Sequence, residues 1–234
     1  MTAVLPLFAL STVLFPGLVL PLHVFEERYR ALVRTVVNVP AGTTQEFGVV
    51  ALERGWEVDE PAPSAMLASR PWAQSVSLYP VGCTAEVREV TEHPDGRYDL
   101  VTVGRNRFEI VRMLPDETPY PRAEIRYLPE PSAADGEADR LAPGVLAAFR
   151  TYLRLIRTEE VSEQLPDDPT VLSHLIAATA ALTLADRQRL LAAPDTPARL
   201  RAELRLLHRE AGLLRQVRAV PVALSELPAR PGPN

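Results

Sequence analysis

The chain has 234 residues, of which 47% are hydrophobic, and its 25 basic and 30 acidic side chains give a net charge of -5. This length allows one large or two small domains with a buried core, and the negative charge excludes a general attraction to nucleic acid or to an acidic membrane surface. The single cysteine, Cys83, excludes an internal disulfide and a multi-cysteine metal site, so a reducing cytoplasm is the expected location.

Every basic side chain is an arginine, because the sequence contains no lysine. A phosphate-binding P-loop needs a lysine that reaches the β- and γ-phosphates, and a Ser-Lys dyad needs an amine that can lose its proton. Arginine cannot act as that base, because its pKa exceeds ~12. P-loop nucleotide-binding enzymes, Ser-Lys hydrolases and enzymes that form a Schiff base through a lysine are therefore excluded.

The first 25 residues contain no Asp, Glu, Lys or Arg, and three prolines interrupt them. A membrane-spanning helix needs roughly 20 uninterrupted apolar residues, and a secretory signal needs a basic start. Neither pattern is present. The segment instead predicts two strands, Val4–Leu10 and Leu18–Val24, both buried on two faces and joined by a turn at residues 15–17.

One short amphipathic helix is predicted from Glu26, because Tyr29, Leu32, Val33 and Val36 share a face. Further strands are predicted by alternation and turn residues at 47–52, 79–90, 98–103, 107–114 and 123–128. Gly104 is expected to break the chain between two of these strands, and residues 53–75 are expected to form a long loop. Six or seven short strands with one helix predict a closed or nearly closed barrel over residues 1–129.

Residues 130–144 are rich in proline and small acidic residues and are interpreted as a linker. Beyond them the apolar period is helical, and Asp168-Pro169 and Thr196-Pro197 each provide a helix cap followed by proline at the first helical position. Thr183 can cap a short helix between them. Residues 145–220 are therefore predicted to form a helical bundle, and residues 221–234 a disordered tail.

Three stretches of the sequence carry a resemblance to a known family: LPLFALSTVLFPGLVLPLHVFEERYRALV, VGCTAEVREV followed by DGRYDLVTVGRNRFEIV, and LTLADRQRLLAAPDTPARL. Taken in this order, they resemble the amino-terminal domain of Lon proteases. The resemblance implies an α+β fold with a small PUA-like β-barrel and one short helix, followed by an α-helical bundle. It also implies a role in engaging protein substrates and in assembly.

Nothing in the chain resembles the Lon ATPase or Ser-Lys peptidase modules, and the missing lysines exclude both chemistries. The chain thus looks like a free-standing bacterial Lon substrate-binding domain. We expect a non-catalytic protein of cytoplasmic protein quality control that binds unfolded or apolar polypeptide segments. One alternative function is that of an adaptor that delivers clients to a separate protease. Self-association into a homo-oligomer is left open by the sequence.

The expected client contacts are apolar groups at the barrel rim and on the long loop. These candidate peptide-binding residues are Phe15, Pro16, Leu18, Trp56, Met66, Leu67 and Trp72. The tryptophans can equally fold back to cover the end of the barrel, because loops both carry function and cover cores.

No metal site, cofactor or catalytic group is expected. The four histidines, His23, His93, His174 and His208, lack metal-binding spacing, and Cys83 falls on the inward phase of a strand. RNA binding is an alternative, because PUA-like folds include RNA binders and the last helix is rich in arginine. Its arginines are Arg199, Arg201, Arg205, Arg209, Arg215 and Arg218. They are interpreted as a solvated face, since the helix lacks aromatic residues for base stacking.

Overall fold

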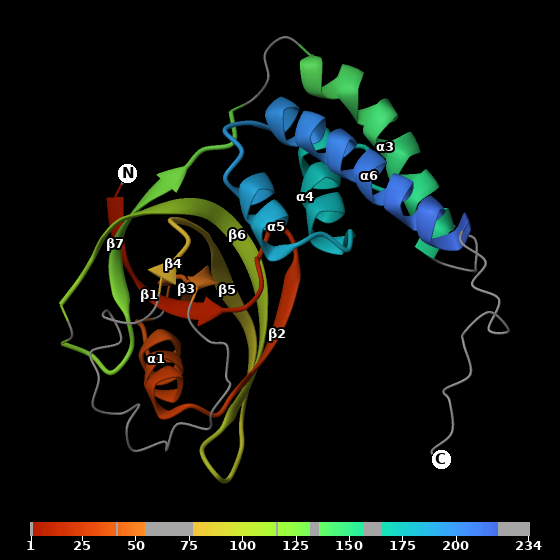
Figure 1. Cartoon of the computed structure of the whole chain (residues 1–234). Helices are drawn as coiled ribbons and strands as arrows, with labels where there is room; N and C mark the ends of the chain where they lie inside the picture. Colours follow the sequence, from red (N-terminus) through yellow and green to blue (C-terminus); the bar gives the residue numbers. More distant parts are fainter. Residues whose placement is uncertain are drawn as a thin grey trace, which may run out of the picture.

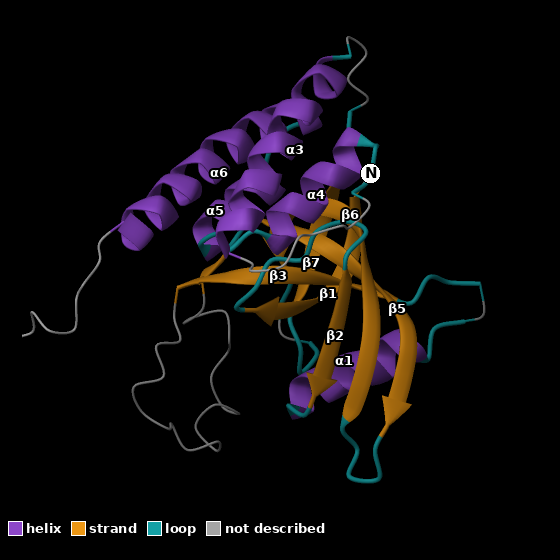
Figure 2. Ribbon diagram, turned by 90° about the vertical axis from the view of Figure 1, so that its right-hand side faces the viewer, coloured by secondary structure: helices purple, strands orange, loops and turns teal. Residues whose placement is uncertain are grey.

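The computed structural model of the chain describes residues 2–40, 42–54, 77–115, 117–131, 136–156 and 165–219. Figure 1 shows two parts, one built from strands with a single helix and one built from the remaining helices, which lie against one side of the sheet. The turned view shows the same layers (Figure 2). Among the described helices, none combines the length and apolar character needed to cross a membrane.

The sheet is mainly antiparallel and closes on itself. Its strands are β1 (Thr2–Leu10), β2 (Val19–Val24), β3 (Glu46–Arg54), β4 (Ser77–Leu78), β5 (Val81–Glu92), β6 (Tyr98–Met113) and β7 (Arg122–Leu128). Antiparallel pairing links β1, β7, β6, β5 and β3 in that order, and a parallel pairing of β1 with β3 completes the ring. β2 pairs with β6 and β4 with β3, so these two strands lie outside the ring.

Helix α1 (Glu27–Val37) packs its apolar face onto the strands. Tyr29, Leu32, Val33 and Val36 are buried, as the helical period predicted. The ring of Tyr29 stacks on Phe8 of β1 with a centroid distance of 3.9 Å, and its hydroxyl accepts a hydrogen bond from the Ala9 amide. These contacts anchor α1 to the strand that closes the ring.

Gly104 does not interrupt the strand, because it lies within β6, which is 16 residues long in all. A Cβ atom at this position would lie 2.2 Å from the carbonyl oxygen of Phe15. The Gly17 amide donates to the Gly104 carbonyl at 2.8 Å, and the Gly104 amide donates to the Leu18 carbonyl at 2.9 Å. The glycine is therefore required for close approach of the turn between β1 and β2, and the predicted break was wrong.

The second part consists of α3 (Glu137–Ile156), α4 (Pro169–Thr179), α5 (Leu184–Leu191) and α6 (Thr196–Ala219). The predicted caps are confirmed at two helices. The Asp168 carboxylate accepts from the amides of Thr170 and Val171, and the Thr183 hydroxyl accepts from the Asp186 amide.

The predicted linker was partly wrong, since α3 begins at Glu137 and contains Pro143. Glu137 and Asp139 stand in its first turn, where the helix dipole favours acidic groups. Ala138 and Ala142 are buried in the helical core, so the apolar face extends further toward the N-terminus than Val145. Within the former linker only residues 132–135 lie outside the described residues, as does the whole predicted tail.

Buried charges join the two parts of the molecule. The Arg107 guanidinium on β6 forms an ion pair with Glu130 at 2.8 Å and donates to the carbonyls of Leu191 and Ala193 at 2.9 and 2.5 Å. Arg199 of α6 binds the other oxygen of Glu130 and donates to the Ser173 hydroxyl at 2.8 Å. Both arginines are buried, so the expectation that Arg199 lies on a solvated face was wrong.

Two further titratable groups are buried on the helical side. Burial, followed by repulsion from Arg199 and Arg107, lowers the pKa of His174 to about 3, so the ring is neutral in the folded protein. Burial raises the pKa of Glu203 well above its ordinary value. His174 lies beside Phe15, with 6.1 Å between the ring centroids.

Substitution of Gly104 by alanine should lower the free energy of unfolding by about 1–3 kcal/mol, because the new methyl group would collide with backbone that cannot move freely. The measurement is urea unfolding followed by circular dichroism. Gly212→Ala is the matched control, since a methyl group added there would have nothing within 4 Å and alanine favours the helix. Equal effects of the two variants would contradict the proposed close approach.

Acid should destabilise the wild type more steeply than the His174→Gln variant. Below the ordinary histidine pKa of about 6.5, the unfolded chain takes up a proton at His174, whereas the folded chain does so only near pH 3. The free energy of unfolding should therefore fall by up to about 1.4 kcal/mol per pH unit below pH 6.5. Denaturant midpoints measured between pH 7 and 5 test this difference. Parallel curves for the two proteins would mean that His174 is not held neutral.

Candidate functional site

The predicted contact residues at the barrel rim occupy different environments. Phe15 is completely buried, so its expected exposure was wrong. It packs between the strands and the helices, where it belongs to the helical core together with Val13. Pro16 and Leu18 are half-buried, and Leu18 contacts the cores on both sides. The loop residues Trp56, Met66, Leu67 and Trp72 lie outside the described residues.

Exposed apolar groups instead lie on β2, which was expected to be buried on both faces. Its side chains alternate: Val19 is 62% exposed and Pro21 is also exposed, whereas Leu20 and Leu22 are half-buried against the core around α1. Only one face of β2 is covered, because α1 lies behind the strand in the view from its outer side (Figure 2). The expectation of two buried faces was therefore wrong for this strand.

The outer face of β2 continues onto β6. Val103 lies directly opposite Val19, and Val101 lies opposite Pro21. Side chains of directly opposed residues share a face of the sheet. Phe25, which is 63% exposed, follows at the end of the same alternating row. We call Val19, Pro21, Val101, Val103 and Phe25 the outer stripe.

The outer stripe borders an open strand edge. Within the described residues β2 pairs with β6 alone, so its other edge has no partner strand. Pro21 lacks a backbone N–H and is tolerated at such an edge. Open edges can pair with a further extended chain, and here the edge lies next to exposed apolar side chains.

The sequence contained a signal for this surface that the expectation of a fully buried strand overlooked. His23 and Pro21 occur at alternate positions with Val19 and Phe25, while leucines and Val24 occupy the positions between them. A histidine and a proline in the same phase indicate an outward face. The hydrophobicity of the remaining residues concealed this alternation.

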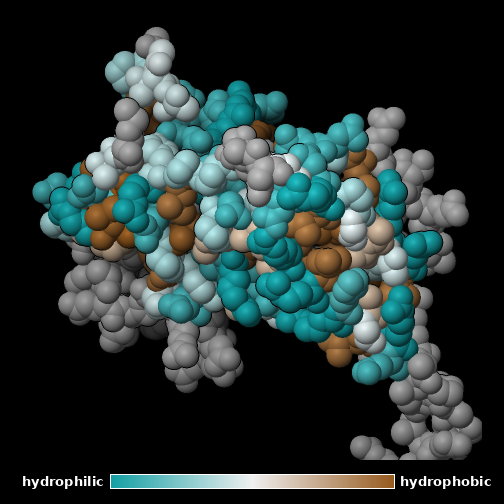
Figure 3. Space-filling view, turned by 90° about the horizontal axis from the view of Figure 1, so that it is seen from above, coloured by the Kyte–Doolittle hydropathy of each residue, from teal (hydrophilic) through white to brown (hydrophobic). Residues whose placement is uncertain are grey.

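The helices present no comparable stripe in the described part of the chain. The exposed apolar residues Ile156, Val171 and Leu213 lie on three different helices. Seen from above, apolar side chains form small patches separated by hydrophilic ones (Figure 3). The row on β2 and β6, in which Val19 and Pro21 are exposed and Val101 and Val103 are half-buried, is therefore the better candidate for contact with an apolar partner.

Two shallow grooves lie elsewhere on the described surface. One of about 330 Å³ lies between α1 and the hairpin of β5 and β6, and one of about 400 Å³ lies between α3 and α6. The first contains Glu92, whose carboxylate accepts from the Tyr98 hydroxyl at 3.1 Å. The second is lined mainly by small residues together with Thr151, His208 and Arg215.

Burial determines the chemistry of Cys83. Its side chain is fully buried, and burial raises the pKa of the thiol to about 12. The thiol therefore stays protonated at neutral pH and acts as a small apolar group. This confirms the inward position predicted for Cys83.

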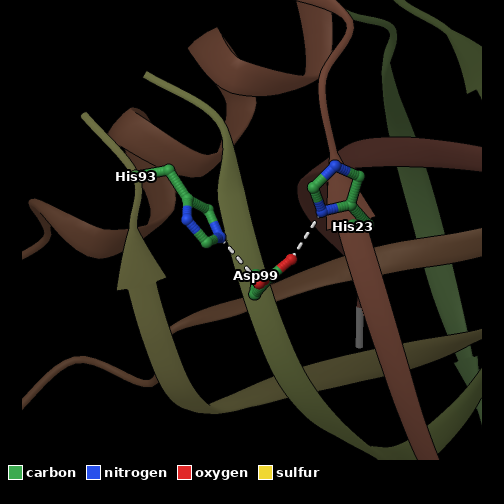
Figure 4. A group of neighbouring side chains, drawn as sticks. All are labelled: His23, His93 and Asp99. Atoms are coloured by element: carbon green, nitrogen blue, oxygen red, sulfur yellow. Dashed lines mark hydrogen bonds and ion pairs between the residues drawn. The ribbon is translucent and has the colours of Figure 1, made fainter. Parts of the chain in front are cut away.

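The histidines are less scattered than their spacing suggested. His23 of β2 and His93 of the hairpin after β5 both contact Asp99 of β6 (Figure 4). No sequence motif links these three residues, because the pairing of β2 with β6 brings His23 to Asp99 across a separation of 76 residues. They are the described residues with ligand atoms grouped closely enough to hold a metal ion.

The arginines of α6 do not form a uniformly basic face. Besides the buried Arg199, Arg201 pairs with Glu137 of α3, and Arg209 pairs with Asp186 of α5 at 2.7 Å. Acidic groups therefore offset several of the charges on which an electrostatic attraction to RNA would depend.

Comparison with protein families identifies the fold. Residues 4–209 match the family model described as "ATP-dependent protease La (LON) substrate-binding domain". The chain belongs to this family. The match confirms the resemblance seen in the sequence, and it covers both the closed sheet and most of the helical part.

Curated relatives of this Lon substrate-binding domain are themselves Lon proteases. A "Lon protease" of Anaeromyxobacter dehalogenans is 30% identical over 220 residues, which are 91% of this chain and 24% of the relative. "Lon protease 1" of Thermus thermophilus is 33% identical over 161 residues, or 66% of this chain and 18% of the relative. The chain thus spans about a quarter or less of these relatives' lengths.

Solved structures share the fold of this Lon substrate-binding domain. The N-terminal domain of the Mycobacterium avium complex Lon protease has a TM-score of 0.59 at 18% identity, with 90% of this chain and 98% of that chain covered. A Lon N-terminal domain protein from Xanthomonas campestris has a TM-score of 0.53 at 22% identity, with 88% and 98% covered. The mixed architecture of a largely antiparallel sheet and packed helices is therefore that of Lon N-terminal domains.

Proposed function

We propose that this chain is a non-catalytic, cytoplasmic polypeptide-binding module, with a closed sheet of PUA-like type, and that it holds apolar client segments on the outer stripe. Membership of the Lon substrate-binding family supports a role in substrate binding. The observation that carries the choice of surface is the exposure of Val19, Pro21 and Phe25 on one face, interrupted only by His23 and bordered by an open strand edge.

The composition of the outer stripe fits clients that vary in sequence. Apolar contact is non-directional, and burial of a Val or Phe side chain contributes up to about 1.5–3 kcal/mol. A few such contacts, reduced by the entropy cost of ordering the client, give weak and reversible association. Such binding suits a module that must release its clients.

The open edge of β2 adds to client binding a contribution that does not depend on the client's sequence. An extended client segment that lies along the edge can form main-chain hydrogen bonds, as in strand addition to exposed sheets. Pro21 offers no N–H and limits the number of these bonds. We therefore assign most of the binding to the apolar side chains and a smaller part to the edge.

Replacement of Val19 and Phe25 together by serine should weaken client binding by roughly tenfold, equivalent to about 1.4 kcal/mol of lost apolar contact. The measurement is the fluorescence anisotropy of a labelled model protein that reduction and alkylation keep unfolded. Val111→Ser is the matched control, because Val111 is 52% exposed but lies toward the other end of β6. Equal affinities of the double variant and the wild type would contradict the proposed surface.

Photocrosslinking should separate the outer stripe from the long-loop residues predicted from the sequence. A photoreactive group at Phe25 should attach to the unfolded model protein more efficiently than one at Val111. A third group at Trp72 tests the prediction that the loop also contacts clients. Crosslinks at Trp72 without crosslinks at Phe25 would place the client on the loop and reject the outer stripe.

A further inference from the structure

His23, His93 and Asp99 bring three possible ligand atoms to one point of the surface. The His23 Nδ1 atom lies 2.6 Å from one carboxylate oxygen of Asp99, and the His93 Nε2 atom lies 2.7 Å from the other. The ligand atoms of the three side chains all lie within 4.8 Å of one another. Figure 4 shows both imidazole rings directed at the carboxylate.

The backbone fixes the positions of these residues. His23 and Asp99 are opposed across the pairing of β2 with β6. In the turn that carries His93, the His93 amide donates to the Arg97 carbonyl and the Gly96 amide donates to the His93 carbonyl, both at 2.8 Å. Gly96 has a φ of 77° and lies against the Arg30 guanidinium of α1. The three side chains therefore project from ordered elements.

Two imidazoles and one carboxylate are suitable ligands for zinc and related transition metals. Ligand atoms around one tetrahedral ion lie about 3.3 Å apart, given metal–ligand distances of about 2.0–2.1 Å. The two short contacts to Asp99 must therefore widen by less than about 1 Å. This adjustment is available, since the side chains of His23 and Asp99 are half exposed.

Stability of the fold does not by itself require this arrangement. Exposed ion pairs typically contribute no more than about 1 kcal/mol, and the β-ladder already holds the strands together. An aspartate carboxylate is ordinarily ionised at neutral pH, as a metal ligand must be.

We propose that His23, His93 and Asp99 form a binding site for one divalent transition-metal ion, with Zn²⁺ as the expected occupant. His23 supplies Nδ1, His93 supplies Nε2, and Asp99 supplies a carboxylate oxygen. Three protein ligands leave a coordination position for water or for a group of a bound partner. The site adjoins the outer stripe, because the His23 and Phe25 ring centroids are 6.2 Å apart.

Arg97 makes the proposed ligation mode testable. One of its guanidinium nitrogens lies 3.4 Å from His23 Nε2, the ring nitrogen that points away from Asp99. Metal binding at Nδ1 places the remaining imidazole proton on Nε2, where it faces the cationic arginine. Arg97 also pairs with Asp95 at 2.6 Å, which offsets part of its charge. Removal of the guanidinium should thus favour metal binding.

The test is a titration of the full chain, prepared without a histidine tag, with Co²⁺ and then Zn²⁺. The visible absorption of bound Co²⁺ should indicate one site per chain, and Zn²⁺ should displace it. His23→Ala, His93→Ala and Asp99→Asn should each weaken binding roughly tenfold or more. His208→Ala is the matched control, because this exposed histidine lies on α6 outside the cluster.

Absence of binding by the wild type would overturn the proposal, as would binding that His93→Ala leaves unchanged or that His208→Ala abolishes. Arg97→Ala should bind the metal more tightly than the wild type, and weaker binding by this variant would contradict ligation through His23 Nδ1. Circular dichroism confirms that each variant is folded. The readout is the metal itself, so failure of client binding would leave this result unaffected.

Discussion

The contact of the half-buried Glu130 carboxylate with two buried arginines is the interaction on which the arrangement of the two parts depends. The carboxylate receives Arg107 from the closed sheet and Arg199 from α6, and both arginines are shielded from water. An ion-pair network of this kind need not stabilise the fold more than apolar residues would. Removal of one of its residues, however, leaves a buried charge without a partner. The charges therefore specify how the helices sit on the sheet. Arg107 also binds the carbonyls of Leu191, at the end of α5, and Ala193, so the same side chain holds the segment that leads from α5 to α6.

The contact between the sheet and the helices explains two departures from expectation near the N-terminus. Phe15 was expected to be exposed and is buried, whereas β2 was expected to be buried and exposes one face. The turn that carries Phe15 is enclosed between β6 and the helices, where Gly104 admits its backbone and His174 covers the ring. The strand that follows extends beyond the helices and exposes one face. A turn that would form the rim of an isolated barrel becomes core once the helices dock. The exposed surface is thereby displaced onto β2.

Local signals in the sequence predicted much of the fold. The caps at Asp168 and Thr183 depend on residues two or three positions apart, and the buried face of α1 follows from the helical period. The partners of Glu130 and the meeting of His23 with His93 depend on contacts between distant segments, which no local pattern encodes. Gly104 illustrates the difference: a glycine marks either a break or a close approach, and only the neighbouring chain decides which applies.

The continuity of β6 has a consequence for how this fold can vary. This one strand carries Asp99, Val101 and Val103 near one end, Gly104 in the middle, and the buried Arg107 and Phe108 beyond it. Side chains alternate between faces, so an inserted or deleted residue reverses the orientation of every residue on one side of the change unless a bulge absorbs it. Substitutions on the outer face of β6 keep every side chain on its own face of the sheet, whereas a change in the length of the strand does not. Insertions are more readily accommodated in the turn between β5 and β6, outside the ladder.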